Sequence, residues 1–416
     1  MLRRSDSTIW QLIEGEKRRQ KYGLELIPSE NYVSAAVLEA AGSILTNKYS
    51  EGYPRKRYYG GQEYIDQVEE LARQRLLKLF KLNPINWHAN VQPYSGSPAN
   101  MAIYFAIVQP GETIMGLKLV EGGHLTHGHK VNFSGKLYNA VQYSLDPKTE
   151  RLNYDEIGEL AKKHKPKLII SGATAYPRII DFRKFQKIAQ EVGAVHLADI
   201  SHIAGLIVAG VHHSPFPFTD VVMTTTHKTL RGPRSAVIVC KKQYAEVIDK
   251  AVFPGLQGGP HEHTIAAKAV CFAEANTARF RAYAKQIVKN SKVLAEELLN
   301  RGYRLVTGGT DNHLILVDLT PKGITGKQAQ ITLDAVGITV NKNTIPNEPR
   351  SPFDPSGIRL GTPAITSRGM KQREMKQIAK LIDEALKNRD NKTEVKKIRQ
   401  AVINLAKRFP VPGIDQ

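Results

Sequence analysis

The residues with the most specific chemistry lie at the end of an apolar segment in the middle of the chain. Residues 220–230 read DVVMTTTHKTL, a strand-like run that ends in polar residues and includes Lys228. Ligands of open α/β sheets bind at the carboxyl ends of strands. A lysine in that position can form a Schiff base with an aldehyde cofactor once its surroundings lower its pKa. The alternative interpretation is an ordinary solvent-exposed lysine.

A second apolar segment, residues 194–199, ends in Asp199. We expect it to be a neighbouring strand, one strand–helix unit before Lys228. A carboxylate there can pair with a protonated pyridine nitrogen and strengthen a cofactor ring as an electron sink. A helix N-cap or a metal ligand is the other interpretation of Asp199. The pair of residues at adjacent strand ends is more specific than either residue alone.

A phosphate site is suggested by residues 94–100, YSGSPAN, which precede an apolar helical run. Ser95, Gly96 and Ser97 would expose backbone N–H groups at the start of that helix, where the helix dipole favours an anion. The same pattern also occurs in an ordinary capped helix. Residues 253–260, FPGLQGGP, form a second glycine-rich loop whose backbone could approach an anion.

The histidines are dense in residues 122–129, GGHLTHGH, and in residues 261–263, HEH. A zinc site is the obvious hypothesis, but no HExxH motif occurs and the glycines argue against a helix that fixes the ligand spacing. We therefore predict no metal. We expect His124 to lay its flat ring against a flat cofactor.

Composition bounds the remaining possibilities. The 416 residues include 59 basic and 39 acidic side chains, a formal charge of +20 that favours anionic partners without choosing among nucleic acid, membrane and small polyanions. Only two cysteines occur, Cys240 and Cys271, so neither a disulfide framework nor a structural zinc is indicated. Neither a secretory signal nor a long apolar run is apparent. These features predict a soluble protein of the reducing cytoplasm.

The alternation of apolar runs and amphipathic stretches predicts a parallel sheet with helices on both faces, followed by a smaller α+β domain. We expect an N-terminal arm over residues 1–45, a large domain over 46–275 and a small domain over 276–416. The terminal basic helix, 387–408, is interpreted as a solvated helix face. Other predicted helices cover 9–21, 181–192 and 264–301, and predicted strands cover 113–116, 167–171, 194–199, 220–226, 236–240, 303–307, 313–318 and 358–361.

Several long motifs resemble the serine hydroxymethyltransferase family over about residues 9 to 385. They are LIPSEN at 26–31, NKYSEGYP at 47–54, RYYGG at 57–61, GGHLTHG at 122–128, TTTHKTL at 224–230, GPR at 232–234, QGGP at 257–260, GTDNH at 309–313, NKN at 341–343 and GIRLGTPA at 357–364. The resemblance implies the aspartate-aminotransferase-like fold, fold type I of pyridoxal-phosphate enzymes. That fold agrees with the alternating pattern.

The resemblance also implies roles for individual residues. Lys228 would carry pyridoxal phosphate as a Schiff base, Asp199 would pair with the pyridine nitrogen, and Arg359 would bind the serine carboxylate as a bidentate fork. Implied catalytic residues are Lys228, Glu51, His227, Tyr59 and Thr226. Implied cofactor-binding residues are Ser95, Gly96, Ser97, His124, Thr174, Asp199, His202, Lys228 and, from the opposite subunit, Gly259. Implied serine or glycine contacts are Ser29, Tyr49, Glu51, Tyr59, His202 and Arg359, and implied folate contacts are Leu119, Gly123, His124, Leu125, Asn343, Ser351, Pro352 and Phe353.

The implied reaction is the reversible conversion of L-serine and tetrahydrofolate to glycine and 5,10-methylenetetrahydrofolate, by a homodimer or tetramer with shared active sites. The sequence departs from the family at a few positions: Thr174 replaces a commoner serine, Pro28 an alanine and Arg55 a frequent glycine, and residues 83–88 are longer than in many relatives. None of these changes removes a catalytic group.

Two other functions remain as alternatives. A threonine aldolase-type enzyme would share the lysine, aspartate and arginine, although the motifs on the folate side argue against it. A basic RNA-binding protein is permitted by the charge, but no RNP1-like run, KH-type GxxG or zinc knuckle is apparent. We therefore expect neither nucleic acid nor a membrane as the principal partner, and the polyglutamate tail of folate offers a simpler use for some of the positive charge.

Overall fold

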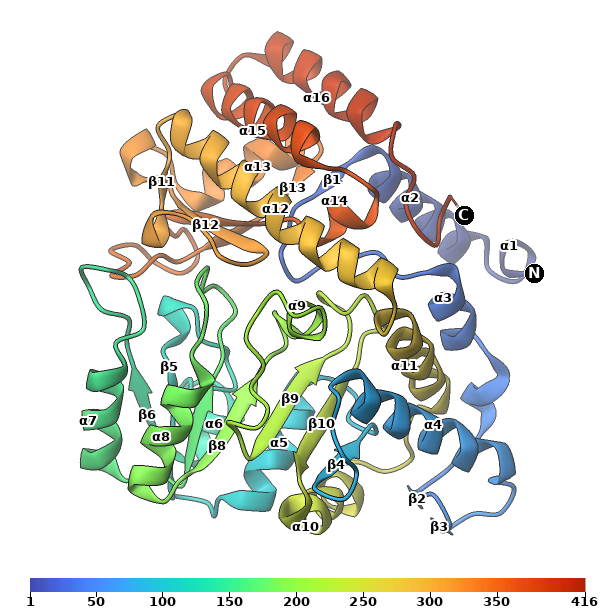
Figure 1. Ribbon diagram of the computed structural model, residues 1–416. Helices are drawn as coiled ribbons and strands as arrows, with labels where there is room; N and C mark the ends of the chain where they lie inside the picture. Colours follow the sequence, from blue (N-terminus) through green and yellow to red (C-terminus); the bar gives the residue numbers. More distant parts are fainter. Residues whose placement is uncertain (416) are drawn as a thin grey trace. The chain divides into compact units, whose positions relative to one another are not determined.

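The computed structural model describes residues 1–415, which divide into two compact units (Figure 1). Unit 1 combines residues 1–35 with the residues from 286 onward, and unit 2 comprises residues 36–285. The first boundary follows Ala35, and the second falls inside helix α12 (Ala278–Asn300). The predicted division of the chain into an arm (1–45), a large domain (46–275) and a small domain (276–416) stays a prediction.

Unit 2 is built on a seven-stranded sheet, and each central strand is buried along its whole length or nearly so. Strand β10 pairs antiparallel with both of its neighbours, whereas the remaining pairs are parallel. The predicted α/β class with a mostly parallel sheet is therefore confirmed. In spatial order the strands are β4 (Trp87–Asn90), β10 (Ala236–Lys241), β9 (Val221–Thr225), β8 (Val195–Asp199), β7 (Leu168–Ser171), β5 (Thr113–Leu117) and β6 (Asn139–Tyr143).

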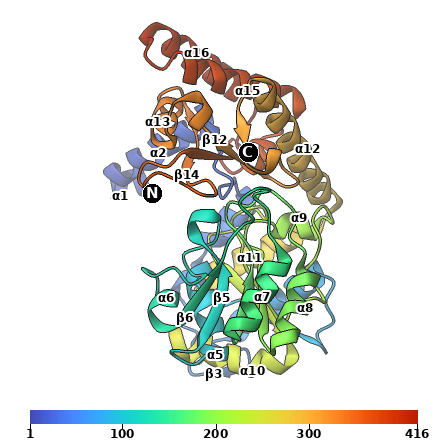
Figure 2. The same ribbon diagram turned by 90° about the vertical axis from the view of Figure 1, so that its left-hand side faces the viewer.

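Helices cover both faces of this sheet because alternate strand residues point to opposite sides. On one face, α5 (Gly96–Ile107) packs Ile103 into the same core as Leu168 and Ile170. On the other face, α8 (Phe182–Val192) places the Phe185 ring 5.9 Å from the His196 ring of β8. Figure 2 shows α7 (Tyr154–His164) beside α8 along the sheet.

One long helix predicted from the sequence is divided in the structure. The long helix predicted over residues 264–301 is in fact two helices, α11 (Glu262–Ala275) and α12. The two helices are separate because Thr277, which precedes α12, caps its N-terminus: the Thr277 hydroxyl accepts a hydrogen bond from the Phe280 N–H at 3.2 Å. The other elements are α3 (Ala35–Ala41), η1 (Ile44–Asn47), β2 (Gly52–Tyr53), β3 (Lys56–Arg57), α4 (Glu63–Leu79), η2 (Leu119–Glu121), α6 (Phe133–Leu137), α9 (Ala204–Val208), η3 (Lys242–Tyr244), α10 (Ala245–Lys250) and η4 (Ala251–Leu256).

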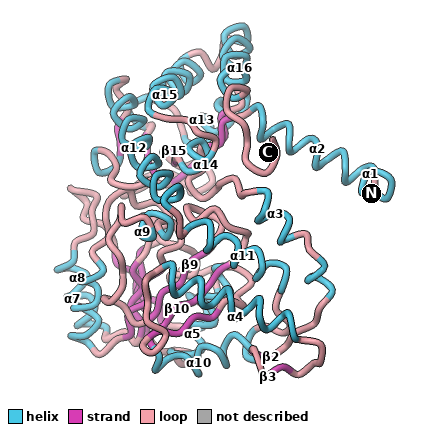
Figure 3. Tube along the Cα trace, turned by 45° about the vertical axis from the view of Figure 1, so that its right-hand side comes forward, coloured by secondary structure: helices cyan, strands magenta, loops and turns pink. Residues whose placement is uncertain are grey.

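Unit 1 is an α+β assembly around a four-stranded antiparallel sheet in the order β11 (Arg304–Leu305), β12 (Leu314–Asp318), β15 (Gly357–Gly361) and β14 (Asn341–Asn343). A separate parallel pair joins β1 (Leu24–Glu25) to β13 (Ile338–Thr339). The helices are α1 (Leu2–Ser5), α2 (Ser7–Tyr22), α13 (Gly326–Ala335), α14 (Pro363–Ser367), α15 (Gln372–Lys387) and α16 (Lys392–Ala406), with η5 (Val306–Gly308) and η6 (Thr320–Lys322). Figure 3 distinguishes these helices from the strands and loops.

The predicted terminal helix, 387–408, corresponds to α16, which begins only at Lys392 because residues 388–391 separate it from α15. Asn391 caps α16 by accepting hydrogen bonds from Thr393 N and Glu394 N. The apolar side of α16 is buried through Ile398 and Val402, and its lysines Lys392, Lys396 and Lys397 are exposed. The exposed lysines fit the interpretation of a solvated basic face.

A buried arginine ties the two sequence segments of unit 1 together. Arg368 is 3% exposed and donates hydrogen bonds to the carbonyls of Gly23 at 2.8 Å and Ala406 at 2.6 Å. It also donates to the carbonyls of Gln20, Lys21 and Phe409. These carbonyls are at or beyond the last turns of α2 and α16, where intrahelical donors are lacking.

Within residues 1–415, no helix is both long enough and apolar enough to cross a membrane.

Candidate functional site: the Lys228 cavity

Strands β8 and β9 bring Asp199 and Lys228 to the same edge of the sheet. The strands are parallel, with Asp199 opposite Met223, and Lys228 follows shortly after the end of β9. Both residues line one cavity, as their predicted positions at adjacent strand ends require. Its other lining residues are Gly96, His124, His127, Ala173, Thr174, Ser201, His202, Met223 and Thr225, so Gly96, His124, Thr174 and His202 from the predicted set are also here.

Asp199 is a buried carboxylate that the surrounding donors keep ionised. Burial alone would raise its pKa, but the hydrogen bond from His127 Nε2 at 3.2 Å and the Ser201 N–H at 3.1 Å hold the pKa well below its usual range. Asn100 Nδ2 donates a further hydrogen bond at 3.2 Å. A buried aspartate that is ionised at neutral pH stabilises a cation placed against it.

His124 contributes a neutral ring to the same cavity. Burial, together with the neighbouring His127, lowers the pKa of His124 to about 4. Its Nδ1 lies 2.7 Å from Thr126 Oγ1, which in turn accepts a hydrogen bond from Asn100 at 2.8 Å. These contacts fix the ring orientation, and a neutral ring is suited to packing against another flat ring.

Lys228 donates a hydrogen bond from Nζ to Thr225 Oγ1 at 3.2 Å. Thr226 and His227, both predicted to be catalytic, are not among the described residues that line the cavity. Thr226 is buried and donates to the Pro233 carbonyl at 2.6 Å, which shapes the loop after β9. Burial lowers the pKa of His227 to about 3, and the adjacent Lys228 contributes to the same shift.

The start of α5 fits a phosphate. Ser95 is the N-cap residue, and its side chain does not cap the helix, so the first N–H groups are available to an anion. A Cβ on Gly96 would lie 2.9 Å from Thr225 Cγ2, so a glycine is needed where α5 approaches β9. Ser95 and Ser97 are exposed and lie on either side of Gly96, which itself lines the cavity.

A second cluster gathers Tyr49, Glu51, Tyr59 and the glycine loop. Tyr49 Oη donates to Glu51 Oε1 at 3.3 Å, and the rings of Tyr49 and Tyr59 pack edge to face at 5.2 Å. A Cβ on Gly259 would lie 3.3 Å from the Tyr49 ring. Among residues 1–415, none of these four lines the Lys228 cavity of the same chain.

The segment that carries Glu51 rests on buried charges. Arg57 donates to the carbonyls of Ser50 at 2.8 Å and Gly52 at 2.9 Å, the residues on either side of Glu51. Its guanidinium also pairs with Glu69 at 2.8 Å and Asp66 at 2.9 Å.

The Ser50 hydroxyl reaches a second buried acid on the other side of this segment. Ser50 Oγ donates to Glu262 Oε1 at 2.6 Å. The other carboxyl oxygen of Glu262 is buried without a hydrogen-bond partner among the described residues. Burial, together with the nearby Glu69, raises the pKa of Glu262 to about 7.

The departure at Arg55 has a structural consequence. Arg55 adopts φ +66°, the left-handed region that glycine enters without steric cost, which explains why a glycine is favourable there.

The predicted folate-side residues of unit 2 lie on the loop after β5. Leu119 begins the short helix η2, and Leu125 is 41% exposed. Gly123 is sterically required, because a Cβ there would lie 2.0 Å from the Leu117 carbonyl oxygen. Thr174 Oγ1 donates to the Gly123 carbonyl at 2.9 Å, so the hydroxyl retained at this departure from the family holds the loop in place.

The remaining predicted residues belong to unit 1. Arg359, in β15, is 9% exposed and donates from Nε to Asn341 Oδ1 at 3.1 Å. Burial lowers the pKa of Arg359 to about 10, so the guanidinium remains charged at neutral pH. Ser29 is half-buried, Asn343 ends β14, and Ser351, Pro352 and Phe353 are exposed.

Sequence reasoning missed three residues that support Asp199 and His124. The histidine-rich pattern suggests for His127 only a metal-ligand role, whereas its Nε2 bonds to Asp199. Asn100 and Thr126 link the two cavity residues through hydrogen bonds. The signal was their position inside the two motifs 94–100 and 122–129, but no local pattern states which polar residue points inward. Within residues 1–415, no group of three or more His, Cys, Asp or Glu could hold a metal ion.

Lys228 can bind an aldehyde, Asp199 can keep a pyridine nitrogen protonated, and the start of α5 can hold a phosphate. Pyridoxal phosphate carries all three groups, so the sheet and this cavity define a pyridoxal-phosphate enzyme of fold type I. A protein-family model described as serine hydroxymethyltransferase matches residues 2–382. The chain belongs to the serine hydroxymethyltransferase family, and the resemblance inferred from the motifs is confirmed.

Proposed function

We propose that this enzyme transfers the hydroxymethyl carbon of L-serine to tetrahydrofolate, and that the reaction is reversible. Serine and tetrahydrofolate would yield glycine, 5,10-methylenetetrahydrofolate and water. The observation that carries the proposal is the cavity in which an ionised, buried Asp199 and Lys228 lie together with a neutral His124. Membership of the family supports the choice of substrates.

Pyridoxal phosphate, when bound, would supply an aldehyde for the substrate amine and a ring that accepts the electron pair of the broken Cα–Cβ bond. Lys228 would hold the cofactor covalently between turnovers. Asp199, kept charged by His127 and Asn100, would hold a proton on the ring nitrogen. His124 would contact the ring, and the first N–H groups of α5 would bind the phosphate.

Arg359 and Glu51 would act on the two ends of serine. We assign the substrate carboxylate to the charged guanidinium of Arg359, which offers a planar pair of donors. Glu51 would accept and return the proton of the serine hydroxyl, because it is the carboxylate that Tyr49 holds in place in the second cluster. Leu119, Gly123, Leu125, Asn343 and residues 351–353 would contact folate.

We further propose that two copies share each active site. The Tyr49, Glu51, Tyr59 and Gly259 cluster does not line the Lys228 cavity of its own chain among the described residues. A two-fold interface presents the same surfaces reciprocally, so the cluster of one subunit can complete the cavity of the other. Cys240 and Cys271 are buried free thiols, which supports a reducing compartment such as the cytoplasm.

The test uses purified, cofactor-loaded protein and measures glycine formed from serine with and without tetrahydrofolate, together with methylenetetrahydrofolate where tetrahydrofolate is present. We expect folate-dependent product, and a new long-wavelength absorption band when glycine and tetrahydrofolate are added together. Cleavage of threonine without any folate-dependent conversion of serine would instead identify an aldolase and refute the proposal. Lys228→Gln serves as the inactive control.

A further inference from the structure

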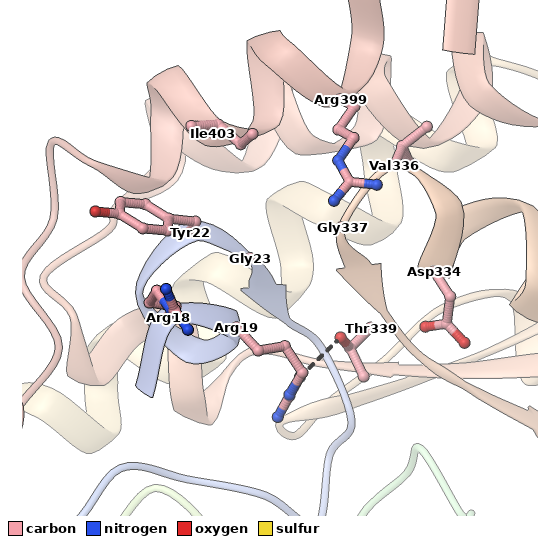
Figure 4. A pocket seen from close by; sticks show the side chains of 10 residues that line it. All are labelled: Arg18, Arg19, Tyr22, Gly23, Asp334, Val336, Gly337, Thr339, Arg399 and Ile403. Atoms are coloured by element: carbon pink, nitrogen blue, oxygen red, sulfur yellow. Dashed lines mark hydrogen bonds between the residues drawn. The ribbon is translucent and has the colours of Figure 1, made fainter. Parts of the chain in front are cut away.

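Unit 1 contains a cavity of about 620 Å³ that the proposed reaction does not use (Figure 4). This volume lies within the ordinary range for sites that bind small molecules. The walls come from α2, the β1–β13 pair, the end of α13, and α16. The lining residues are Arg18, Arg19, Tyr22, Gly23, Asp334, Val336, Gly337, Thr339, Arg399 and Ile403.

The walls of this cavity are held together before any ligand binds. The Leu24 N–H donates to the Gly337 carbonyl at 2.9 Å, which continues the pairing of β1 with β13. Arg19 reaches across to Thr339 Oγ1 at 3.3 Å. The buried Arg368 binds carbonyls at the ends of both α2 and α16. A pre-formed cavity loses little conformational entropy when it binds a ligand.

The cavity lining carries an excess of positive charge. Arg19 is paired with Glu16 at 2.8 Å, but among residues 1–415 no carboxylate lies within 4.0 Å of the guanidinium of Arg18 or Arg399. Figure 4 shows Arg399 extending from α16 toward the opposite wall. Asp334 is the one acid among the described lining residues. Two arginines without carboxylate partners in a concave site are suited to a phosphate group.

The same cavity also offers an apolar surface. Tyr22 and Ile403 lie together on one side of the view in Figure 4, and Val336 lies on the opposite side. Lys407 Nζ lies 5.6 Å from the centre of the Tyr22 ring. A flat ring can pack against Tyr22, and Asp334 can accept hydrogen bonds from hydroxyl or amino groups of the same ligand.

We propose that this cavity binds a small organic phosphate that carries a flat ring, of the nucleoside phosphate class. Arg18 and Arg399 bind the phosphate, Tyr22 and Ile403 contact the ring, and Asp334 accepts hydrogen bonds from the sugar or the base. This site is separate from the Lys228 cavity, since all of its lining residues belong to unit 1.

The experiment is calorimetric titration of the full-length, cofactor-loaded protein with ADP, pyrophosphate and adenosine at low salt. Loading the cofactor first occupies the phosphate site at the start of α5. We expect saturable binding of ADP, weaker binding of pyrophosphate and weakest binding of adenosine. Arg399→Ala and Arg18→Ala should each weaken ADP binding by roughly tenfold or more, because one charge-assisted hydrogen bond is worth at least that factor.

Two further variants separate specific binding from general charge. Arg373→Ala removes an exposed arginine of α15 outside the cavity and should leave ADP binding unchanged. Tyr22→Leu should weaken ADP binding more than pyrophosphate binding. The proposal is overturned if ADP does not bind saturably, or if Arg373→Ala loses as much affinity for ADP as the cavity variants do. It is also overturned if Arg399→Ala changes the oligomeric mass of the protein but not its affinity for ADP. None of these variants touches the Lys228 cavity.

Discussion

Replacing Arg57 with methionine removes a buried cation and keeps a side chain of similar length. The Arg57 side chain is 3% exposed, and its partner Glu69 is 1% exposed. After the substitution Glu69 would retain Gln92 Nε2 as a donor, at 3.1 Å, but would lose its cation. The Ser50 carbonyl would lose the donor that holds one side of Glu51.

The size of the effect follows from this burial. Removing one partner of a buried ion pair costs about 3–5 kcal/mol, because the remaining charge stays desolvated. Each kcal/mol lowers the melting temperature of a domain the size of unit 2 by about 2–4 °C, so we expect a fall of roughly 6–20 °C. The measurement is a thermal melt of the cofactor-loaded protein at pH 8, where protonation of Glu69 relieves the penalty least.

Arg55→Met is the matched control, two residues away in the same loop. The Arg55 side chain is 82% exposed and lies 3.7 Å from Glu70, an exposed pair worth about 0–1 kcal/mol. The melting temperature of Arg55→Met should therefore stay within about 4 °C of wild type. A melting temperature for Arg57→Met within about 2 °C of wild type, or an equal fall in Arg55→Met, would refute the reasoning.

The remaining predictions concern the active site and the buried Glu262. Lys228→Gln should abolish the borohydride-stable attachment of cofactor, measured by mass spectrometry; retained attachment would place the link elsewhere. Mixed dimers of Lys228→Gln and Glu51→Gln chains should regain roughly a quarter of wild-type activity, because half the dimers then hold one intact site, and no recovery despite verified mixing would contradict shared sites. The pKa of Glu262, raised to about 7 from 4.5, means that its neutral form is favoured in the folded state, so its stabilising contribution is full below pH 4.5 and is lost as the pH rises through 7. With about 1.4 kcal/mol per pKa unit this loss is roughly 3.5 kcal/mol, so Glu262→Gln should raise the melting temperature over wild type more at pH 8 than at pH 5; equal differences would disprove the assignment.

The sheet and the centre of the site could be predicted because both depend on local patterns. The strands over residues 194–199 and 220–226 were predicted within one residue, since buried parallel strands are continuous apolar runs. Their parallel pairing then placed Asp199 and Lys228 at one edge, as the structure shows.

Other parts of the structure depend on contacts between distant segments and gave no local signal. The bond from His127 to Asp199 joins the loop after β5 to the end of β8, so its direction could not be read from the GGHLTHGH motif. The break between α11 and α12 depends on the Thr277 cap inside an otherwise continuous helical pattern. Arginine is a residue type that is usually exposed, and only the folded chain shows that Arg57 is buried among carboxylates.

The two-segment composition of unit 1 constrains how the chain folds as it is synthesised. The residues of unit 2 are contiguous, so all of them leave the ribosome before the second segment of unit 1 does. The end of the nascent α2 cannot make its native contacts early, because the guanidinium that binds its last carbonyls belongs to Arg368. The same guanidinium also binds the carbonyls of Ala406 and Phe409. Until those residues emerge from the ribosome, Leu24 and Leu26 lack the core that covers them, so the nascent N-terminal segment exposes apolar side chains that the finished fold buries.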